Sequence, residues 1–199
     1  SYADVLFFAQ FLFQNGRAPR FIGKRSVFNV PVIGRILLAA GQIPVDREST
    51  HASKALDHAV AALTAGHLIG IYPEGTLTRD ENLWPMIAKT GAARLALITK
   101  LPIIPVAAWG IGDVLAPYNK IPRIWPRSKI TLRAGKPIDM SLWYGKEDDP
   151  AALAEATLHI MGELTTMLEE IRGEKRPAHI FDPHTSDLPR TGNFKKKRA

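Results

Sequence analysis

The chain has 199 residues, of which 46% are hydrophobic and 23% are charged. This length favours one domain, and this composition is typical of a globular protein rather than of a disordered or fibrous one. The sequence contains no cysteine, which excludes a disulfide framework, a thiolate metal site and a cysteine nucleophile. The net charge of +7 favours anionic partners but does not distinguish phosphates, lipid headgroups and nucleic acid.

No stretch of about 18 uncharged apolar residues occurs, so we expect no transmembrane helix within the chain. Contact with a membrane is then expected to be peripheral or to lie outside these residues. The chain begins at Ser1 rather than at Met, and no charged leader precedes the apolar residues 5–8. We therefore expect no secretory signal here, and a fragment whose upstream sequence has been removed.

Three segments in the first third of the chain predict helices. Residues 5–14 are apolar and end at Asn15-Gly16, and residues 27–40 form a mostly apolar segment broken by Pro31 and Gly34, which predicts a helix with irregular edges. Ser49 is a possible N-cap for a third helix, with apolar residues at helical spacing until Gly66. We expect the first two segments to lie in the core, with a membrane-facing position as the alternative.

Strands and helices alternate in the rest of the chain. Residues 68–72, 103–108 and 129–133 predict strands, residues 88–99 predict a helix, and a long amphipathic helix begins near Pro150 and ends near Gly173. This alternation predicts an α/β fold, a layered mixed sheet flanked by helices in a single domain of residues 1–173. Residues 174–199 predict a Pro-rich, basic and partly disordered tail.

The positive charge is concentrated in two segments without acidic residues and in the tail, which ends in four basic residues at 195–198. We expect these regions to meet phosphate or anionic lipid, and a solvated basic end is the alternative for the tail. The basic residues of the two segments, 5–45 and 114–138, are Arg17, Arg20, Lys24, Arg25, Arg35, Lys120, Arg123, Arg127, Lys129, Arg133 and Lys136.

Residues 71–80 form the most informative candidate site, because a predicted strand runs directly into a Pro-Glu-Gly-Thr loop. Gly75 allows backbone amides to approach an anion, Thr76 adds a hydroxyl donor, and Arg79 can add a charge-assisted hydrogen bond. The carboxylate of Glu74 would repel an anion unless it holds loop amides or a nearby base. From residue types alone, an ordinary strand-to-helix turn remains the alternative.

Three segments carry a resemblance to a known family. Residues 72–78 read Tyr-Pro-Glu-Gly-Thr-Leu-Thr, residues 41–47 read Gly-Gln-Ile-Pro-Val-Asp-Arg, and residues 101–106 form an apolar run around a proline. In content, order and spacing they resemble the third, second and fourth motif blocks of the glycerolipid acyltransferases, the 1-acyl-glycerol-3-phosphate acyltransferase family. Lys24 stands where this family usually has a basic residue. The resemblance covers roughly residues 1–140.

The first block of that family is Asn-His-x-Ser-x-x-Asp, and its serine and aspartate resemble Ser1 and Asp4. The matching histidine would stand two positions before Ser1. None of the six histidines in the chain has an aspartate five positions later, so none can replace it. We expect His179 and His184 to be solvated residues of the tail rather than metal ligands.

The resemblance implies transfer of a fatty acyl group from a thioester, acyl-CoA or acyl carrier protein, to a hydroxyl of a lysophospholipid such as 1-acyl-glycerol-3-phosphate. It implies that the histidine removes the hydroxyl proton and that Asp4 orients this histidine, without an acyl-enzyme or a cofactor. It also implies a site for the acceptor phosphate, held by Arg47 with Lys24 and Arg79 as weaker candidates, in a loop shaped by Glu74, Gly75 and Thr76.

Several alternatives remain open beside this interpretation. Leu77 stands where the family usually has Arg, so either Arg79 replaces that contact or the acceptor is held differently. Asp4 could only cap the following helix, and Arg47 could only pair with a neighbouring acid at the surface. A non-catalytic lipid- or phosphate-binding protein on the same fold is the alternative function. No nucleic acid is expected as a partner, and the expected location is the cytoplasmic face of a membrane, reached peripherally or through upstream sequence.

Overall fold

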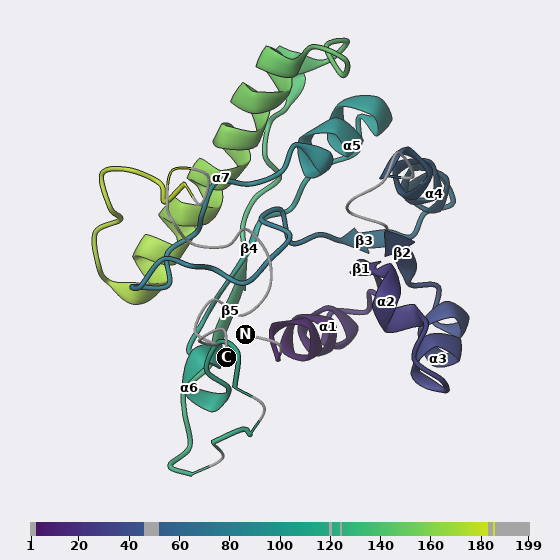
Figure 1. Cartoon of the computed structure of the whole chain (residues 1–199). Helices are drawn as coiled ribbons and strands as arrows, with labels where there is room; N and C mark the ends of the chain where they lie inside the picture. Colours follow the sequence, from purple (N-terminus) through teal and green to yellow (C-terminus); the bar gives the residue numbers. More distant parts are fainter. Residues whose placement is uncertain (1–2, 46–51, 120, 124, 183–184, 186–199) are drawn as a thin grey trace.

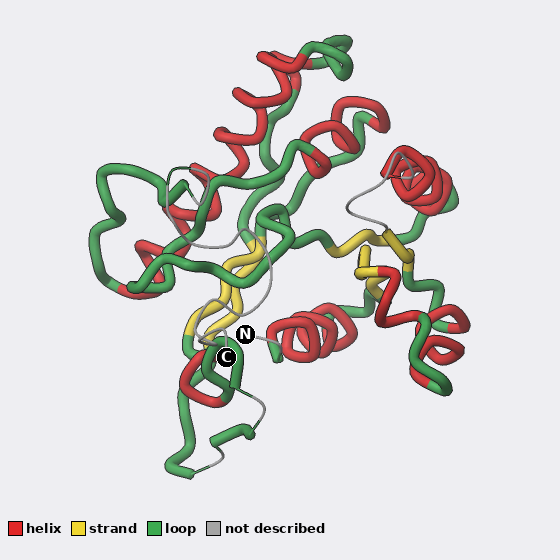
Figure 2. The backbone as a smooth tube through the Cα atoms, viewed as in Figure 1, coloured by secondary structure: helices red, strands yellow, loops and turns green. Residues whose placement is uncertain are grey.

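The computed structural model describes residues 3–45, 52–119, 121–123, 125–182 and 185, without the side chains of residues 52–54. Helices and short strands alternate along these residues, which confirms the predicted α/β class (Figures 1 and 2). In chain order the elements are α1 (Asp4–Gln14), β1 (Pro19–Lys24), α2 (Arg25–Phe28), α3 (Ile33–Ala39), β2 (Ile43–Val45), α4 (Ala52–Thr64), β3 (Leu68–Gly70), α5 (Gly91–Thr99), β4 (Val106–Trp109), α6 (Ile111–Val114), β5 (Thr131–Ala134), the 3-10 helix η1 (Ser141–Trp143) and α7 (Pro150–Arg172).

The described strands form two sheets with different strand directions. In the first, β1 lies between β2 and β3 and is parallel to both, with Ile22 opposite Ile43 and Phe21 opposite Gly70. In the second, β4 and β5 pair antiparallel. Because the three strands of the first sheet are parallel, their carboxyl ends meet at one edge. The segments that follow Lys24, Val45 and Gly70 therefore begin at the same edge.

Helices cover both faces of the parallel sheet. Ile22 belongs to a core formed with Ile43, Ala59 and Ala62, so α4 packs on one face. The neighbouring Phe21 points to the opposite face, as alternation along a strand requires. There its ring lies 5.6 Å from that of Phe8 in α1, measured between centroids. The chain around β3 is thus enclosed between α1 and α4.

A second core lies between α5 and α7. Ala93, Ala96 and Leu97 of α5 pack with Leu153 and Ala156 of α7. Leu95 of α5 instead joins the core under the parallel sheet, so α5 connects the two cores. The ends of α7 agree with the prediction: the Asp149 side chain accepts hydrogen bonds from two backbone amides of the first turn, and Gly173 ends the helix in the left-handed conformation.

Three expectations need correction. Residues 27–40 do not form one helix, since the chain turns at residues 29–32 between α2 and α3. The core position expected for residues 5–14 and 27–40 is wrong for much of both segments. Leu6 and Phe13 of α1 are 72% and 61% exposed, and Ile33 and Ile36 of α3 are 50% and 61% exposed. The strands β1 and β2 were not predicted, and the predicted strand at 68–72 ends at Gly70.

The start of the predicted tail lies beside the segment that follows the Pro-Glu-Gly-Thr loop. Met86 and Phe181 form an isolated parallel β-bridge, and the backbone N–H of Ile87 donates to the carbonyl of Phe181 at 3.0 Å. The basic residues 195–198 lie outside the described residues. Among the helices that the structure describes, none is long and apolar enough to span a bilayer.

Candidate active site

The Pro-Glu-Gly-Thr segment forms a tight turn at the carboxyl edge of the parallel sheet. The backbone N–H of Gly75 donates to the carbonyl of Tyr72 at 3.0 Å, and Gly75 has a φ of +67°. This left-handed conformation is one that glycine adopts without steric cost. Lys24 ends β1 at the same edge and is exposed. The fold therefore brings two of the predicted segments to one edge of the sheet.

Asp4 lies in the first turn of α1 and is half-buried. The N-cap position is held by Ala3, whose carbonyl accepts hydrogen bonds from Leu6 and Phe7, so Asp4 does not occupy the cap. A carboxylate in the first turn is stabilised by the helix dipole. The structure thus places Asp4 at the amino end of α1, close to the turn that contains Tyr72 and Glu74.

Tyr72 packs against α1, the helix that begins at Asp4. Desolvation of the Tyr72 hydroxyl and, secondarily, the Asp4 carboxylate raise the pKa of Tyr72 above its ordinary value. The ring of Tyr72 contacts Phe8 of α1 and Phe21 of β1, with centroids 5.9 and 6.3 Å away. These contacts pack Tyr72, the first residue of the third block, against α1, which begins at Asp4 of the first block.

Glu74 is held by a backbone amide twelve residues further along the chain. Its Oε2 accepts a hydrogen bond of 2.9 Å from the N–H of Met86. Burial raises the pKa of Glu74 to about 7; the Asp4 carboxylate also raises it, whereas the Met86 N–H opposes the shift. Glu74 therefore holds the loop amide, one of the two functions that the sequence suggested for a carboxylate here.

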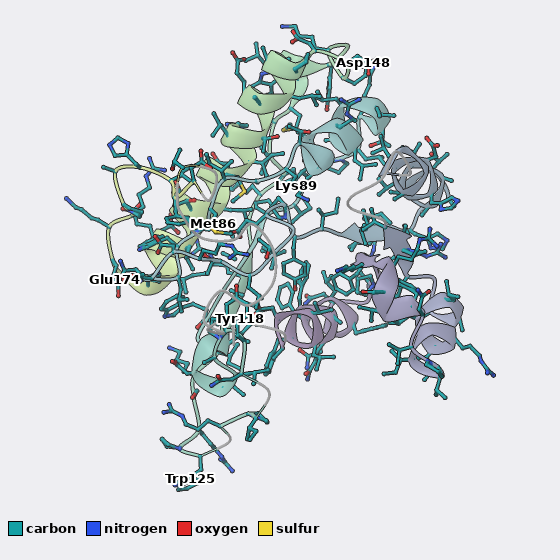
Figure 3. All side chains as sticks on the ribbon, in the orientation of Figure 1. Met86, Lys89, Tyr118, Trp125, Asp148 and Glu174 are labelled. Atoms are coloured by element: carbon teal, nitrogen blue, oxygen red, sulfur yellow. The ribbon has the colours of Figure 1, made fainter. Side chains whose placement is uncertain are left out.

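Lys89 is a cation at this turn that the sequence analysis did not select. A methyl group on Gly75 would lie 3.5 Å from the Cδ and Cε atoms of Lys89 and 3.8 Å from its Nζ, so the lysine side chain passes over the turn. The Lys89 N–H also donates to the carbonyl of Pro73 at 2.9 Å. Lys89 is exposed, and Figure 3 shows it on the segment between Met86 and α5. Its only signal in the sequence was a cation in the predicted helix 88–99.

The other residues selected in the loop occupy less exposed positions. Arg79 is 2% exposed, and its backbone N–H lies 3.0 Å from the sulfur of Met86. Thr76 and Leu77 are half-buried. Contact between Arg79 and a dissolved phosphate would therefore require the loop to move.

Arg47, the main candidate for the acceptor phosphate, lies outside the described residues, as do Ser1 and the predicted cap Ser49. Val45, which ends β2, is described and lies opposite Lys24 in the sheet. Among the described residues, no group of three or more His, Cys, Asp and Glu side chains is placed to hold a metal ion.

Comparison with known proteins gives consistent matches. Residues 1–109 match the family described as Acyltransferase. The chain is 32% identical to the 1-acyl-sn-glycerol-3-phosphate acyltransferase of Haemophilus influenzae over 123 residues, which are 60% of this chain and 48% of that protein. It is 30% identical to the enzyme of that name from Escherichia coli over 163 residues, 79% of this chain and 61% of that protein.

The fold is also similar to a solved structure. The crystal structure of the 1-acyl-sn-glycerophosphate acyltransferase PlsC from Thermotoga maritima superposes with a TM-score of 0.55 at 20% sequence identity, covering 80% of this chain and 59% of that chain. At this identity the likeness concerns the fold alone. The chain spans between about half and three-fifths of the length of these three proteins.

Proposed function

This chain belongs to the acyltransferase family, as its motif blocks predict, and on that premise we propose that it acylates a lysophospholipid. The acceptor would be a lysophosphatidic acid such as 1-acyl-glycerol-3-phosphate, and the donor an acyl-CoA or acyl carrier protein. An ester C–O bond forms while the thioester C–S bond breaks, and the proton of the hydroxyl passes through the base to the leaving thiol. The named activity of the relatives supports this choice.

We propose that the base is a histidine two positions before Ser1 in the encoded protein, with Asp4 as its partner. A hydroxyl is a poor nucleophile at neutral pH, so its proton must be removed during attack. A carboxylate on the other ring nitrogen fixes the tautomer and stabilises the imidazolium. The observation that carries this proposal is the position of Asp4, half-buried at the start of α1 beside Tyr72 and Glu74.

The acceptor phosphate would bind between the turn at Gly75 and the cations around it. Lys89 lies over this turn, Lys24 ends the neighbouring strand, and Arg47 follows β2 by two residues. Cations at the carboxyl ends of adjacent parallel strands can converge on one ligand. The buried Arg79 would then support the loop from inside.

Glu74 would position the loop. Its bond to Met86 ties the turn to the segment that leads to Lys89, so the distance between the turn and this cation depends on that bond. A carboxylate that is partly protonated near pH 7 repels an approaching phosphate less than a fully ionised one does.

The substrates are lipids, so we also propose peripheral attachment to the anionic, cytoplasmic face of a membrane. The acid-free segment 5–45 and the exposed Arg123, Arg127 and Lys129 supply positive charge for this contact. Such attachment weakens as salt screens the charges.

Acyl transfer can be tested with the encoded protein, using acyl-CoA and acyl carrier protein as donors and acceptors with and without a phosphate. We expect an acylated phosphate-bearing product from the parent and almost none from the Asp4→Asn variant. Binding of lysophosphatidic acid without any product would support the non-catalytic alternative and overturn the proposal.

A further inference from the structure

The short helices α2 and α3 carry a group of aliphatic side chains that are exposed in the described part of the chain. We define the α2–α3 tip as Val27, Val30, Val32, Ile33 and Ile36, which are 45%, 42%, 63%, 50% and 61% exposed. In Figure 1, α3 lies at the outer side of α2, away from the second core. Aliphatic residues that gather in this way usually mark a binding surface.

The backbone at the tip adopts a conformation that is unfavourable for its residue. Val32 has a φ of 69° and a ψ of −58°, and the N–H of Ile33 donates to the carbonyl of Pro31 at 2.8 Å. This is a γ-turn of the strained kind, in a β-branched residue for which a positive φ is especially unfavourable. Strain of this type persists where the surrounding structure imposes it, and it occurs most often at functional sites.

The contact between the two helices holds the tip in this shape. Gly34 follows the γ-turn, and a Cβ atom at this position would lie 1.8 Å from the carbonyl oxygen of Phe28. Its N–H also donates to the carbonyl of Val30 at 2.8 Å. Only glycine fits this close approach between α2 and α3, and Val32 and Ile36 on either side of it stay 63% and 61% exposed.

All charged residues between Lys24 and Ile36 are basic. Lys24 and Arg25 precede α2, Arg35 lies within α3, and all three are exposed. No acidic residue occurs from residue 5 to residue 45. Aliphatic side chains surrounded by cations are complementary to an anionic lipid surface, because the apolar groups enter the acyl region while the cations remain among the phosphates.

We infer that the α2–α3 tip inserts into the surface of an anionic membrane. This inference deepens the proposed function by assigning its membrane contact to particular residues. Lys24 ends β1 at the sheet edge that carries the candidate site, so the tip would hold this edge near the lipid from which the acceptor comes.

Binding to vesicles tests this directly. The protein is mixed with phosphatidylcholine vesicles that contain about one-third phosphatidylglycerol, and the bound fraction is measured by sedimentation. The double variant Val32→Asn/Ile36→Gln should bind about tenfold more weakly, because it removes the two most exposed side chains of the tip. Asn tolerates a positive φ and Gln is a good helix former, so the variant should fold. Arg35→Gln should weaken binding about fivefold.

Two further variants control the location of the contact. Leu142→Asn/Leu158→Gln removes two exposed leucines near and on α7, which are 71% and 53% exposed, and should bind like the parent. Ile121→Asn/Trp125→Gln alters another exposed apolar loop, between α6 and β5, that could contact a membrane instead. Trp125 is 78% exposed and lies at the outer end of this loop in Figure 3.

A loss of about threefold or more in the tip variant, with binding retained in the leucine control, supports the inference. A smaller loss in the tip variant overturns it, and a loss in the loop variant would then assign the contact to Ile121 and Trp125. An equal loss in the tip variant and in the leucine control also overturns it. Vesicle binding involves no acyl transfer, so failure of this inference is distinguishable from failure of the proposed function.

Discussion

The carboxylate of Glu74 accepts a hydrogen bond from the backbone N–H of Met86, with 2.9 Å between Oε2 and the nitrogen. This bond links the Pro-Glu-Gly-Thr turn to the segment that precedes α5. It forms beside Asp4, whose charge opposes ionisation of Glu74. The glutamate of the third block is therefore a half-buried acid that is hydrogen-bonded within the loop, close to the acid of the first block.

The Glu74→Gln variant tests this arrangement through the pH dependence of stability. The pKa of Glu74 is about 7 in the folded protein against an ordinary value of 4.5. Between these values the folded protein binds more protons than the unfolded chain, so Glu74 lowers the free energy of unfolding as pH rises through this window. Above pH 7 the full penalty is present, roughly 3 kcal/mol.

Gln cannot ionise, yet its amide oxygen can still accept from Met86. The free energy of unfolding of the variant, relative to that of the parent, should therefore be higher at pH 8 than at pH 5. Denaturant unfolding at the two pH values measures this difference. Glu163→Gln, at an exposed position of α7, should show no such gain. An unchanged difference between variant and parent at the two pH values would show that Glu74 ionises normally.

The Asp4→Asn variant should reduce acyl transfer by about 10²- to 10⁴-fold, the usual contribution of general acid–base catalysis. Asn preserves the shape of the side chain but cannot stabilise an imidazolium. The measurement is the initial rate with acyl-CoA and 1-acyl-glycerol-3-phosphate, with thermal unfolding as a check of the fold. Near-normal turnover in a folded variant would remove Asp4 from the mechanism.

The Lys89→Met variant should raise KM for a phosphate-bearing acceptor about tenfold, because a charge-assisted hydrogen bond is lost while the alkyl chain over Gly75 is retained. KM for a monoacylglycerol, which has no phosphate, should not change. Lys146→Met, exposed before α7, serves as the control. Equal losses with both acceptors would argue against a phosphate contact.

The Arg172→Met variant should lower the free energy of unfolding by about 2–4 kcal/mol. The guanidinium of Arg172 lies between the rings of Trp84 and Trp109, at 4.1 and 4.0 Å from their centroids, and donates to the carbonyl of Asn82 at 2.8 Å. Its side chain is only 6% exposed. Denaturant unfolding measures the loss, and Arg176→Met, exposed beyond the helix, should leave stability nearly unchanged. A similar effect of both variants would assign the loss to charge alone.

The sequence predicted the elements whose signals are local. The long helix α7 has apolar residues at helical spacing, a capping Asp149 and a terminating Gly173, and each of these was readable from the chain. The strand β1 was missed because its residues, Pro19 to Lys24, include two cations and a glycine instead of alternating apolar residues. It is formed by pairing with β2 and β3 on either side and by the Gln42 side chain, which accepts from the Phe21 N–H at 2.8 Å.

The sequence predicted the part of the candidate site whose signals are local. The residues of the motif blocks were identifiable from their types and order, and the fold brings Asp4 near Glu74 as those blocks imply. Lys89 and Met86 were not identifiable, because they reach the site through a loop that turns back on itself. The burial of Arg79 depends on that same loop and was not visible in residue types.

The bridge between Met86 and Phe181 bears on how the protein can be shortened for crystallisation. A chain that ends at Gly173, where α7 stops, would lose the β-bridge to Met86 and the hydrogen bond from the Ile87 N–H. Both contacts lie next to the Met86 N–H, which donates a hydrogen bond to Glu74. A shortened chain should therefore end beyond Phe181. Limited proteolysis between Gly173 and Phe181 should loosen the Glu74 loop before it affects α7.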